Sequence, residues 1–177
     1  MHTVVVVLAQ DLLYLLVVIA GLVWLMCSRP QKAALTAEAV LGLVVVGIGI
    51  WVAGHLHTDP RPFVHDPAST PLFSHPADNG FPSDHSAAAG LLTALVFRYR
   101  RIVGAFVAVG AALIAWARVA AHVHHAQDVV AGLVIGVAAG ALAMWLVSLL
   151  VATLSRRGLS IGATQARTTA DRTRDTH

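Results

Sequence analysis

The sequence predicts an all-α integral membrane protein, built as a bundle of about five transmembrane helices. Of its 177 residues, 57% are hydrophobic and only 12% are charged, and the mean hydropathy is +0.74. These values are well above those of a soluble domain. Several apolar runs approach the roughly 20 residues that a helix needs to cross a bilayer. Because backbone groups must be satisfied internally in lipid, we expect these runs to form packed helices.

The first two predicted spans cover residues 4–26 and 33–53, with the basic turn 28–32 between them. Glu38 falls in the first turns of the second span. A carboxylate at this depth is unfavourable unless it snorkels or pairs with a basic group. We therefore expect a structural role for Glu38.

A long polar segment, residues 54–82, follows the second span and shows no helical period. It is rich in proline, histidine and aspartate. Loops of this length without their own secondary structure are uncommon in compact domains unless they bind a ligand or take part in catalysis. The segment is thus a candidate part of a functional site.

Three more spans are predicted, at residues 83–98, 102–121 and 126–154. The apolar part of the first of these has about 14 residues and covers roughly 20 Å, which is short of the hydrocarbon thickness of about 30 Å. Its start should therefore lie at or slightly below the membrane surface. Residues 155–177 are polar and rich in Arg and Thr, and we expect a disordered basic cytoplasmic tail after a membrane domain of residues 1–154.

The basic residues predict the orientation of the bundle. Following the chain through five spans puts ten of the twelve on one side of the membrane, namely Arg29, Lys32, Arg98, Arg100, Arg101, Arg156, Arg157, Arg167, Arg172 and Arg174. By the positive-inside rule this side is cytoplasmic. Arg61 and Arg118 fall on the opposite side, so the polar loop should face outwards from the inner (plasma) membrane. The net charge of +3 then reflects topology and the tail, without a nucleic-acid partner.

The third polar block lies between the last two spans, where Arg118, His124 and Asp128 follow one another. If a helix includes His124 and Asp128, their spacing of four residues puts both on one face. A carboxylate can then orient the imidazole, whose other nitrogen becomes a nucleophile or base, and Arg118 can hold an anion. The alternative reading is that these polar residues only solvate a helix end.

Two upstream blocks fall on the same predicted side of the membrane, Pro60–Phe63 and Phe81–His85. Ser83 is a favourable N-cap for the third span. The backbone N–H groups that follow an N-cap form an anion site, where a phosphate could dock.

Together, Arg61-Pro62, Pro82-Ser83-Asp84-His85 and Arg118-x5-His124-x3-Asp128 resemble the three-part signature of the type 2 phosphatidic acid phosphatase superfamily of membrane enzymes. The resemblance implies that His124 is the nucleophile and that Asp128 orients it. It implies that His85 protonates the leaving oxygen, and that Arg61, Arg118 and Ser83 bind the phosphate. A phosphohistidine intermediate follows from these roles.

The sequence departs from the family pattern at three points. A lysine usually begins the first block, but Gly54 stands at that place. Two alternatives follow: His55 or His57 supplies a donor, or the phosphate depends more on Arg61 and Arg118. Many members have six spans, whereas five are predicted for this chain. Asp84 replaces the usual glycine. Together with Pro60–Phe63 and the spacing His75-x-x-Asp78 before the second block, this variant resembles the bacterial branch that dephosphorylates undecaprenyl diphosphate and confers bacitracin resistance. Asp84 either complements the helix dipole or handles substrate.

The resemblance therefore implies a membrane hydrolase of a lipid phosphate or diphosphate, most specifically undecaprenyl diphosphate, with no metal or other cofactor. A phosphatidate or phosphatidylglycerol phosphate phosphatase is the alternative within the superfamily. From another class, a noncatalytic histidine-rich membrane protein could bind haem or metal, for example through His122, His124 and His125 with Asp128. The expected partners are a lipid phosphate and the membrane lipids, and the sequence does not determine the oligomeric state.

Overall fold

The computed structural model describes residues 2–66 and 68–174, with side chains described as far as residue 155. Seven helices and no strand are formed in this part of the chain, and one isolated β-bridge joins Pro60 to Asn79. The helices are α1 (His2–Gln10), α2 (Leu12–Leu25), α3 (Arg29–Leu56), α4 (Pro62–His65), α5 (Asp84–Tyr99), α6 (Arg101–Ala120) and α7 (Ala126–Arg174). The predicted all-α class is confirmed.

Among the described residues, three helices are long and apolar enough to cross a membrane: α3, α6 and residues 126–155 of α7. The predicted first span is divided into α1 and α2, which are bent by 44° at Asp11 and count as a fourth span only if taken together. The break therefore coincides with the carboxylate of Asp11, which interrupts the apolar run. With 16 residues, α5 is shorter than a full span, as its short apolar stretch predicted.

In the C-terminal segment, the helical backbone of α7 is described as far as Arg174, and the disordered basic tail after residue 154 stays a prediction. The chain divides into two compact units, residues 1–144 and 145–177. The functional blocks all belong to the first unit. Residues 175–177 of the predicted tail lie outside the described residues.

The outer surfaces of the spanning helices carry large apolar side chains. Ile102 and Phe106 on α6 are 77% and 72% exposed, and Leu43, Ile48, Val130 and Val134 on the other spans are also exposed. In water such patches would drive association. In a bilayer, lipid tails cover them, which fits the membrane protein that composition predicts.

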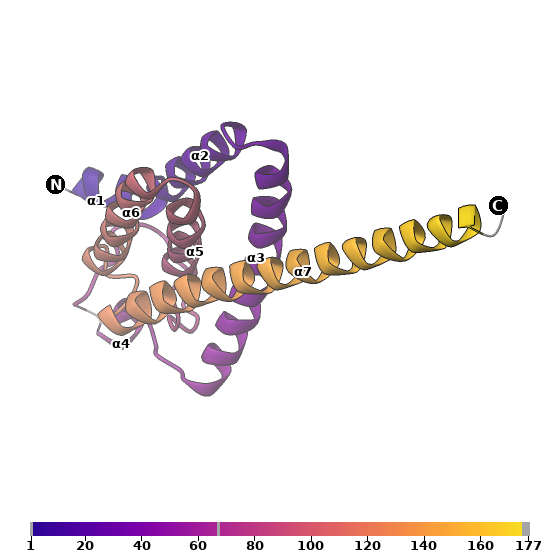
Figure 1. The fold of residues 1–177 in the computed structure, drawn as a ribbon. Coiled ribbons are helices and arrows are strands. Elements are labelled where there is room, and N and C mark those ends of the chain that lie inside the picture. The colour runs from indigo at the N-terminus through magenta and orange to yellow at the C-terminus, as the bar shows by residue number, and fades with distance from the viewer. Residues whose placement is uncertain (1, 67, 175–177) are drawn as a thin grey trace. The chain divides into compact units, whose positions relative to one another are not determined.

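The short helix α5 is the centre of the first unit, where it packs against α2, α3 and α6 (Figure 1). Small residues let α7 approach it closely. A Cβ atom added to Gly136 would collide with the carbonyl oxygen of Ala87, and one added to Gly132 with that of Ser83. This spacing of four residues is the small-residue pattern of closely packed membrane helices. It aligns the first turn of α7 with the first turn of α5.

Glu38 joins the other ends of two helices. Its side chain is fully buried on α3, accepts a 2.9 Å hydrogen bond from the Tyr99 hydroxyl, and lies 3.3 Å from Arg98 Nε. Both partners are at the end of α5. Of the two alternatives considered for Glu38, snorkelling and pairing with a basic group, the structure shows the pairing, which brings the start of α3 beside the end of α5.

The polar blocks consequently gather at the opposite end, where α3 and α6 finish and α5 and α7 begin. His122 ends α6 with a φ of 62°, a left-handed conformation that often terminates a helix. Its Nδ1 atom lies 2.8 Å from the Ser69 hydroxyl. The loop of residues 57–83 is thereby tied to the turn between α6 and α7.

Candidate active site

A small polar cavity of about 140 Å³ lies at this end of the first unit. It is lined by residues from all three sequence blocks and from the loop between them: Arg61, His75, Asp78, Asn79, Pro82, Asp84, His85, Arg118 and His124. At about 30 Å³ per water molecule, the volume equals that of four to five waters. This space suits a phosphoryl group rather than a whole lipid.

His124 is nearly completely buried, and its Nε2 atom is the point on which the two arginines converge. Arg61 Nη1 and Arg118 Nη2 each lie 3.2 Å from this atom. Because a guanidinium only donates hydrogen bonds, Nε2 must act as the acceptor and carries no proton. The lone pair of Nε2 and two guanidinium groups therefore meet at one place.

The other ring nitrogen of His124 is held from behind. Nδ1 lies 2.9 Å from the carbonyl oxygen of Gly80 and 3.4 Å from Asp128 Oδ2. It must donate to these oxygens, which agrees with an unprotonated Nε2. His124 precedes the first residue of α7, so the two side chains do not share a helix face, as the spacing argument assumed. The turn before α7 brings them together instead.

Burial lowers the pKa of His124 below its usual value, and the charges of Arg118 and Arg61 lower it further, although the Asp128 carboxylate opposes them. The ring is therefore neutral near pH 7. A neutral imidazole with an unprotonated Nε2 is the form that can act as a nucleophile.

The two arginines are themselves held in place. Arg61 Nε donates a 2.7 Å hydrogen bond to Asp78, and its Nη1 donates to the carbonyl oxygen of Val123 at 2.8 Å. Arg118 is buried at the end of α6, and its Nη2 donates to His75 Nε2 at 3.0 Å. Their positive charge is thus fixed before any anion binds, as electrostatic stabilisation requires.

His85 and Ser83 have different positions. His85 lines the cavity from the first turn of α5. Ser83 is fully buried behind it, where its hydroxyl accepts from Ser86 N as the N-cap of α5 and its backbone N–H donates to the Asp128 carbonyl. The predicted cap is confirmed. Ser83 does not line the cavity, so it joins the first turns of α5 and α7.

Asn79 organises the loop that carries the first block. Its Oδ1 atom accepts from the backbone N–H groups of Asp59 and Phe81, and its Nδ2 atom donates to the carbonyl oxygens of Gly54 and His57. His55 and His57 were considered as donors in place of the lysine that is missing at Gly54. Neither of them lines the cavity. His75 does line it.

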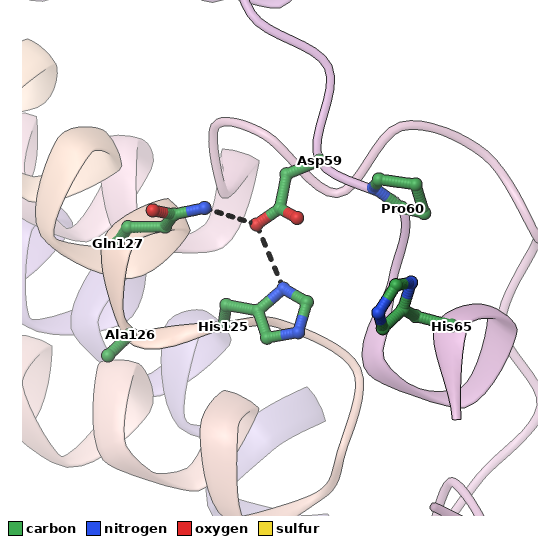
Figure 2. Close-up of a pocket in the computed structure, with 6 residues that line it drawn as sticks. All are labelled: Asp59, Pro60, His65, His125, Ala126 and Gln127. Atoms are coloured by element: carbon green, nitrogen blue, oxygen red, sulfur yellow. Dashed lines mark hydrogen bonds and ion pairs between the residues drawn. The ribbon is translucent and has the colours of Figure 1, made fainter. Parts of the chain in front are cut away.

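Asp59 connects the same loop to α7. Its Oδ2 atom accepts hydrogen bonds from Gln127 at 2.6 Å and from His125 Nδ1 at 2.8 Å. Figure 2 shows this pair beside a second, wider pocket, with His65 on the opposite wall. One ligand atom each from Asp59, His125 and Asp128 lies within 4.8 Å of the others. Within the described part of the chain, these three side chains are therefore the residues that could together hold a metal ion.

Sequence reasoning missed the contributions of Asp59, His75, Asp78, Asn79 and the Gly80 carbonyl. The spacing His75-x-x-Asp78 supported the family resemblance, but it did not predict that these two residues line the cavity. No local pattern indicates that the carbonyl of Gly80 contacts His124, because that contact joins residues 44 positions apart.

Comparison with known proteins places these residues in context. The PAP2 superfamily is matched by residues 34–152. The chain is 32% identical over 139 residues to "Bacitracin transport permease protein BcrC" of Bacillus licheniformis, covering 78% of this chain and 68% of the relative. It is 30% identical over 128 residues to "Undecaprenyl-diphosphatase BcrC" of Bacillus subtilis (strain 168), covering 72% and 64%. The chain thus spans about two thirds of these relatives.

Among solved structures, the crystal structure of Aquifex aeolicus LpxE is similar with a TM-score of 0.60 and 20% sequence identity. The match covers 80% of this chain and 93% of that one. At this identity the similarity concerns the fold alone. It agrees with the helical membrane architecture described above.

Proposed function

Because the chain belongs to the PAP2 superfamily of membrane lipid phosphatases, it is a hydrolase of lipid phosphates, and we propose that it converts undecaprenyl diphosphate to undecaprenyl phosphate through a phosphohistidine. One observation carries the proposed chemistry. The unprotonated Nε2 of His124 lies 3.2 Å from both Arg61 and Arg118 at a cavity of phosphate size. The proposed nucleophile, His124 Nε2, therefore lies next to the two arginines that would bind the phosphate.

In the first step, the Nε2 lone pair of His124 attacks phosphorus and forms a P–N bond. The bond from phosphorus to the leaving oxygen breaks, and His85 is the residue placed to protonate that oxygen. Arg61 and Arg118 neutralise the charge on the transferring group. Asp128 and the Gly80 carbonyl stabilise the proton on Nδ1 as the ring becomes positively charged.

In the second step, water attacks the phosphorus of phosphohistidine and the P–N bond breaks. His85, now unprotonated, accepts the proton of that water. Inorganic phosphate leaves and His124 returns to its neutral form. No step requires a cofactor, since the arginines supply the positive charge.

The named activity of the Bacillus subtilis relative supports a polyprenyl diphosphate as the substrate. The position of the cavity also supports a lipid. It lies at the start of α5, which is too short for a full span. A headgroup can reach His85 and His124 there while its chain stays among the exposed apolar side chains of the helices.

The charge distribution supports an active site in the inner (plasma) membrane that faces away from the cytoplasm. Arg29 and Lys32 lie at the start of α3, Arg100 lies between α5 and α6, and Arg101 is the first residue of α6. The contacts of Glu38 with Arg98 and Tyr99 put these segments at one end of the unit. The cavity is at the other end, and the positive-inside rule orients it outwards.

The substrate is tested by giving the purified full-length protein undecaprenyl diphosphate, farnesyl diphosphate, phosphatidate and phosphatidylglycerol phosphate, and comparing kcat/KM for phosphate release. The expected order puts undecaprenyl diphosphate first. If phosphatidate or phosphatidylglycerol phosphate exceeded both prenyl diphosphates, the alternative phosphatase of the same superfamily would replace the proposal.

The intermediate is tested separately. Rapid acid-free quenching during turnover of a substrate with a radiolabelled terminal phosphate should trap label on the protein, in the acid-labile and base-stable form of a phosphohistidine. His124→Ala should trap none. Label that persisted in this variant would place the covalent bond on another residue.

A further inference from the structure

His75 occupies a position that the proposed reaction does not use. It belongs to the loop before the second block, lines the cavity, and is partly buried. Its Nε2 atom lies 3.0 Å from Arg118 Nη2, the same nitrogen that lies 3.2 Å from His124 Nε2. The rings of His75 and His124 are 6.2 Å apart between centroids. An anion held in front of His124 by Arg118 is therefore within the reach of His75.

The hydrogen bonds of His75 indicate a neutral ring. Its Nε2 atom accepts from a guanidinium, so its proton is on Nδ1, which lies 3.3 Å from the Pro76 carbonyl oxygen. Burial lowers the pKa of His75, and the nearby positive charges of Arg61 and Arg118 lower it further. The two arginines thus keep a third positive charge out of the site.

We propose that His75 is a further phosphate-binding residue, which takes up one proton from solvent when an anionic phosphoryl group enters the cavity. The Arg118 N–H that now donates to His75 Nε2 then donates to the anion. The new proton on Nε2 makes His75 a donor to a phosphoryl oxygen as well. Without this proton, a lone pair of Nε2 would face an anionic oxygen, which is repulsive.

The charges around His75 favour the proton only when the site is filled. The titratable and charged groups that face it across the cavity or on its own loop are Arg61, Asp78, Asp84, His85, Arg118 and His124. Asp78 is already paired with Arg61. A bound dianion adds negative charge beside His75 and offsets the repulsion by the arginines. His75 also supplies a donor that Gly54 cannot provide.

This inference rests on the proposed function only in taking the cavity to be a phosphate site, so its test avoids turnover. Sulfate is a suitable probe, because it is a tetrahedral dianion whose charge does not change between about pH 6 and 8. Its dissociation constant follows from the sulfate-dependent rise in the Tm of the full-length protein in detergent. Uptake of one proton predicts that this constant increases by up to about tenfold per pH unit.

Three proteins are compared: wild type, His75→Gln and the matched control His65→Gln. Glutamine keeps a hydrogen-bond donor but does not titrate, so His75→Gln should bind sulfate with a pH slope smaller by one proton. His65 lies in the second pocket (Figure 2), and its variant should keep the wild-type slope. The inference is overturned if His75→Gln has the wild-type slope, or if sulfate does not raise the Tm of the wild type.

A second measurement needs no variant, in case His75→Gln does not fold. Calorimetric titration of the wild type with sulfate in two buffers of different protonation enthalpy reports the number of protons taken up. The expected number is close to one, and zero would overturn the inference. Lipid turnover is measured independently, so proton-linked sulfate binding without lipid hydrolysis would refute the proposed function alone.

Discussion

The closest hydrogen bond of His124 Nδ1, 2.9 Å long, is to the backbone carbonyl oxygen of Gly80. Asp128 Oδ2 is farther away, at 3.4 Å, and also accepts the backbone N–H of His125 at 2.8 Å. The loop before the second block therefore selects the tautomer of the proposed nucleophile. Asp128 adds a negative charge that stabilises the imidazolium character of the ring during the reaction.

Because Gly80 and Asp128 both contact His124 Nδ1, substitutions of His124 and Asp128 should lower the rate of phosphate release to different extents. His124→Ala should abolish phosphate release, because it removes the lone pair that is proposed to attack phosphorus. Asp128→Asn should lower kcat by at least about a hundredfold but leave measurable turnover, since Gly80 still orients the ring. Steady-state assays with a Tm measurement for folding check this. His124→Ala with near wild-type turnover would show that the nucleophile is another residue.

The role proposed for His85 depends on the leaving group. Protonation matters most when the leaving oxygen is strongly basic. His85→Ala should therefore lower kcat more with phosphatidate, which releases an alcohol, than with undecaprenyl diphosphate, which releases a phosphate. The matched control His65→Ala should affect neither. Equal losses of His85→Ala on both substrates would contradict a general-acid role.

The pKa of His124 can be measured in the free protein. Burial and the two arginines lower this pKa, so the ring should lose its proton at a pH below the ordinary value of 6.5. Asp128→Asn removes a group that raises the pKa, and the titration should then move to still lower pH. NMR of histidine-labelled protein, with His124→Ala for assignment, gives both values. A midpoint at or above 6.5 would be inconsistent with the buried geometry.

The orientation of the bundle is testable with paired cysteine variants. Cys27 is buried, so it is best replaced by serine in the background. Ala68 lies in the loop between α4 and α5, which also carries His75, and Ala33 lies near the start of α3. Both are exposed. In intact cells, a membrane-impermeant thiol reagent should label Ala68→Cys and leave Ala33→Cys unlabelled until the cells are opened. The reverse pattern would turn the cavity to the cytoplasm.

Chelation should leave most of the activity intact, because Arg61 and Arg118 supply the positive charge at the phosphate. The possible ligand group of Asp59, His125 and Asp128 provides a sharp control. If a bound cation there were required, Asp59→Asn would imitate the effect of chelation. Loss of phosphate release with EDTA and recovery with one divalent ion would contradict the proposed mechanism.

The sequence alone determined the membrane class, the helical architecture and the three polar blocks that form the site. These features follow from local patterns: long apolar runs require a bilayer, and the spacings around Arg61, His85 and His124 are short enough to be recognised along the chain. The pairing of Glu38 with a basic group was also predictable, since a carboxylate at membrane depth needs a partner.

Only the tertiary structure decided which of these residues touch and how. It put Ser83 behind the cavity as a cap, brought His75 into the cavity wall, and oriented His124 through the carbonyl of Gly80. The reason is physical. Every residue has a backbone carbonyl, so the sequence does not indicate which carbonyl will contact a site residue. A loop residue acquires a role only when packing brings distant segments within hydrogen-bond distance. Here that packing includes the close approach of α5 and α7 at Gly132 and Gly136.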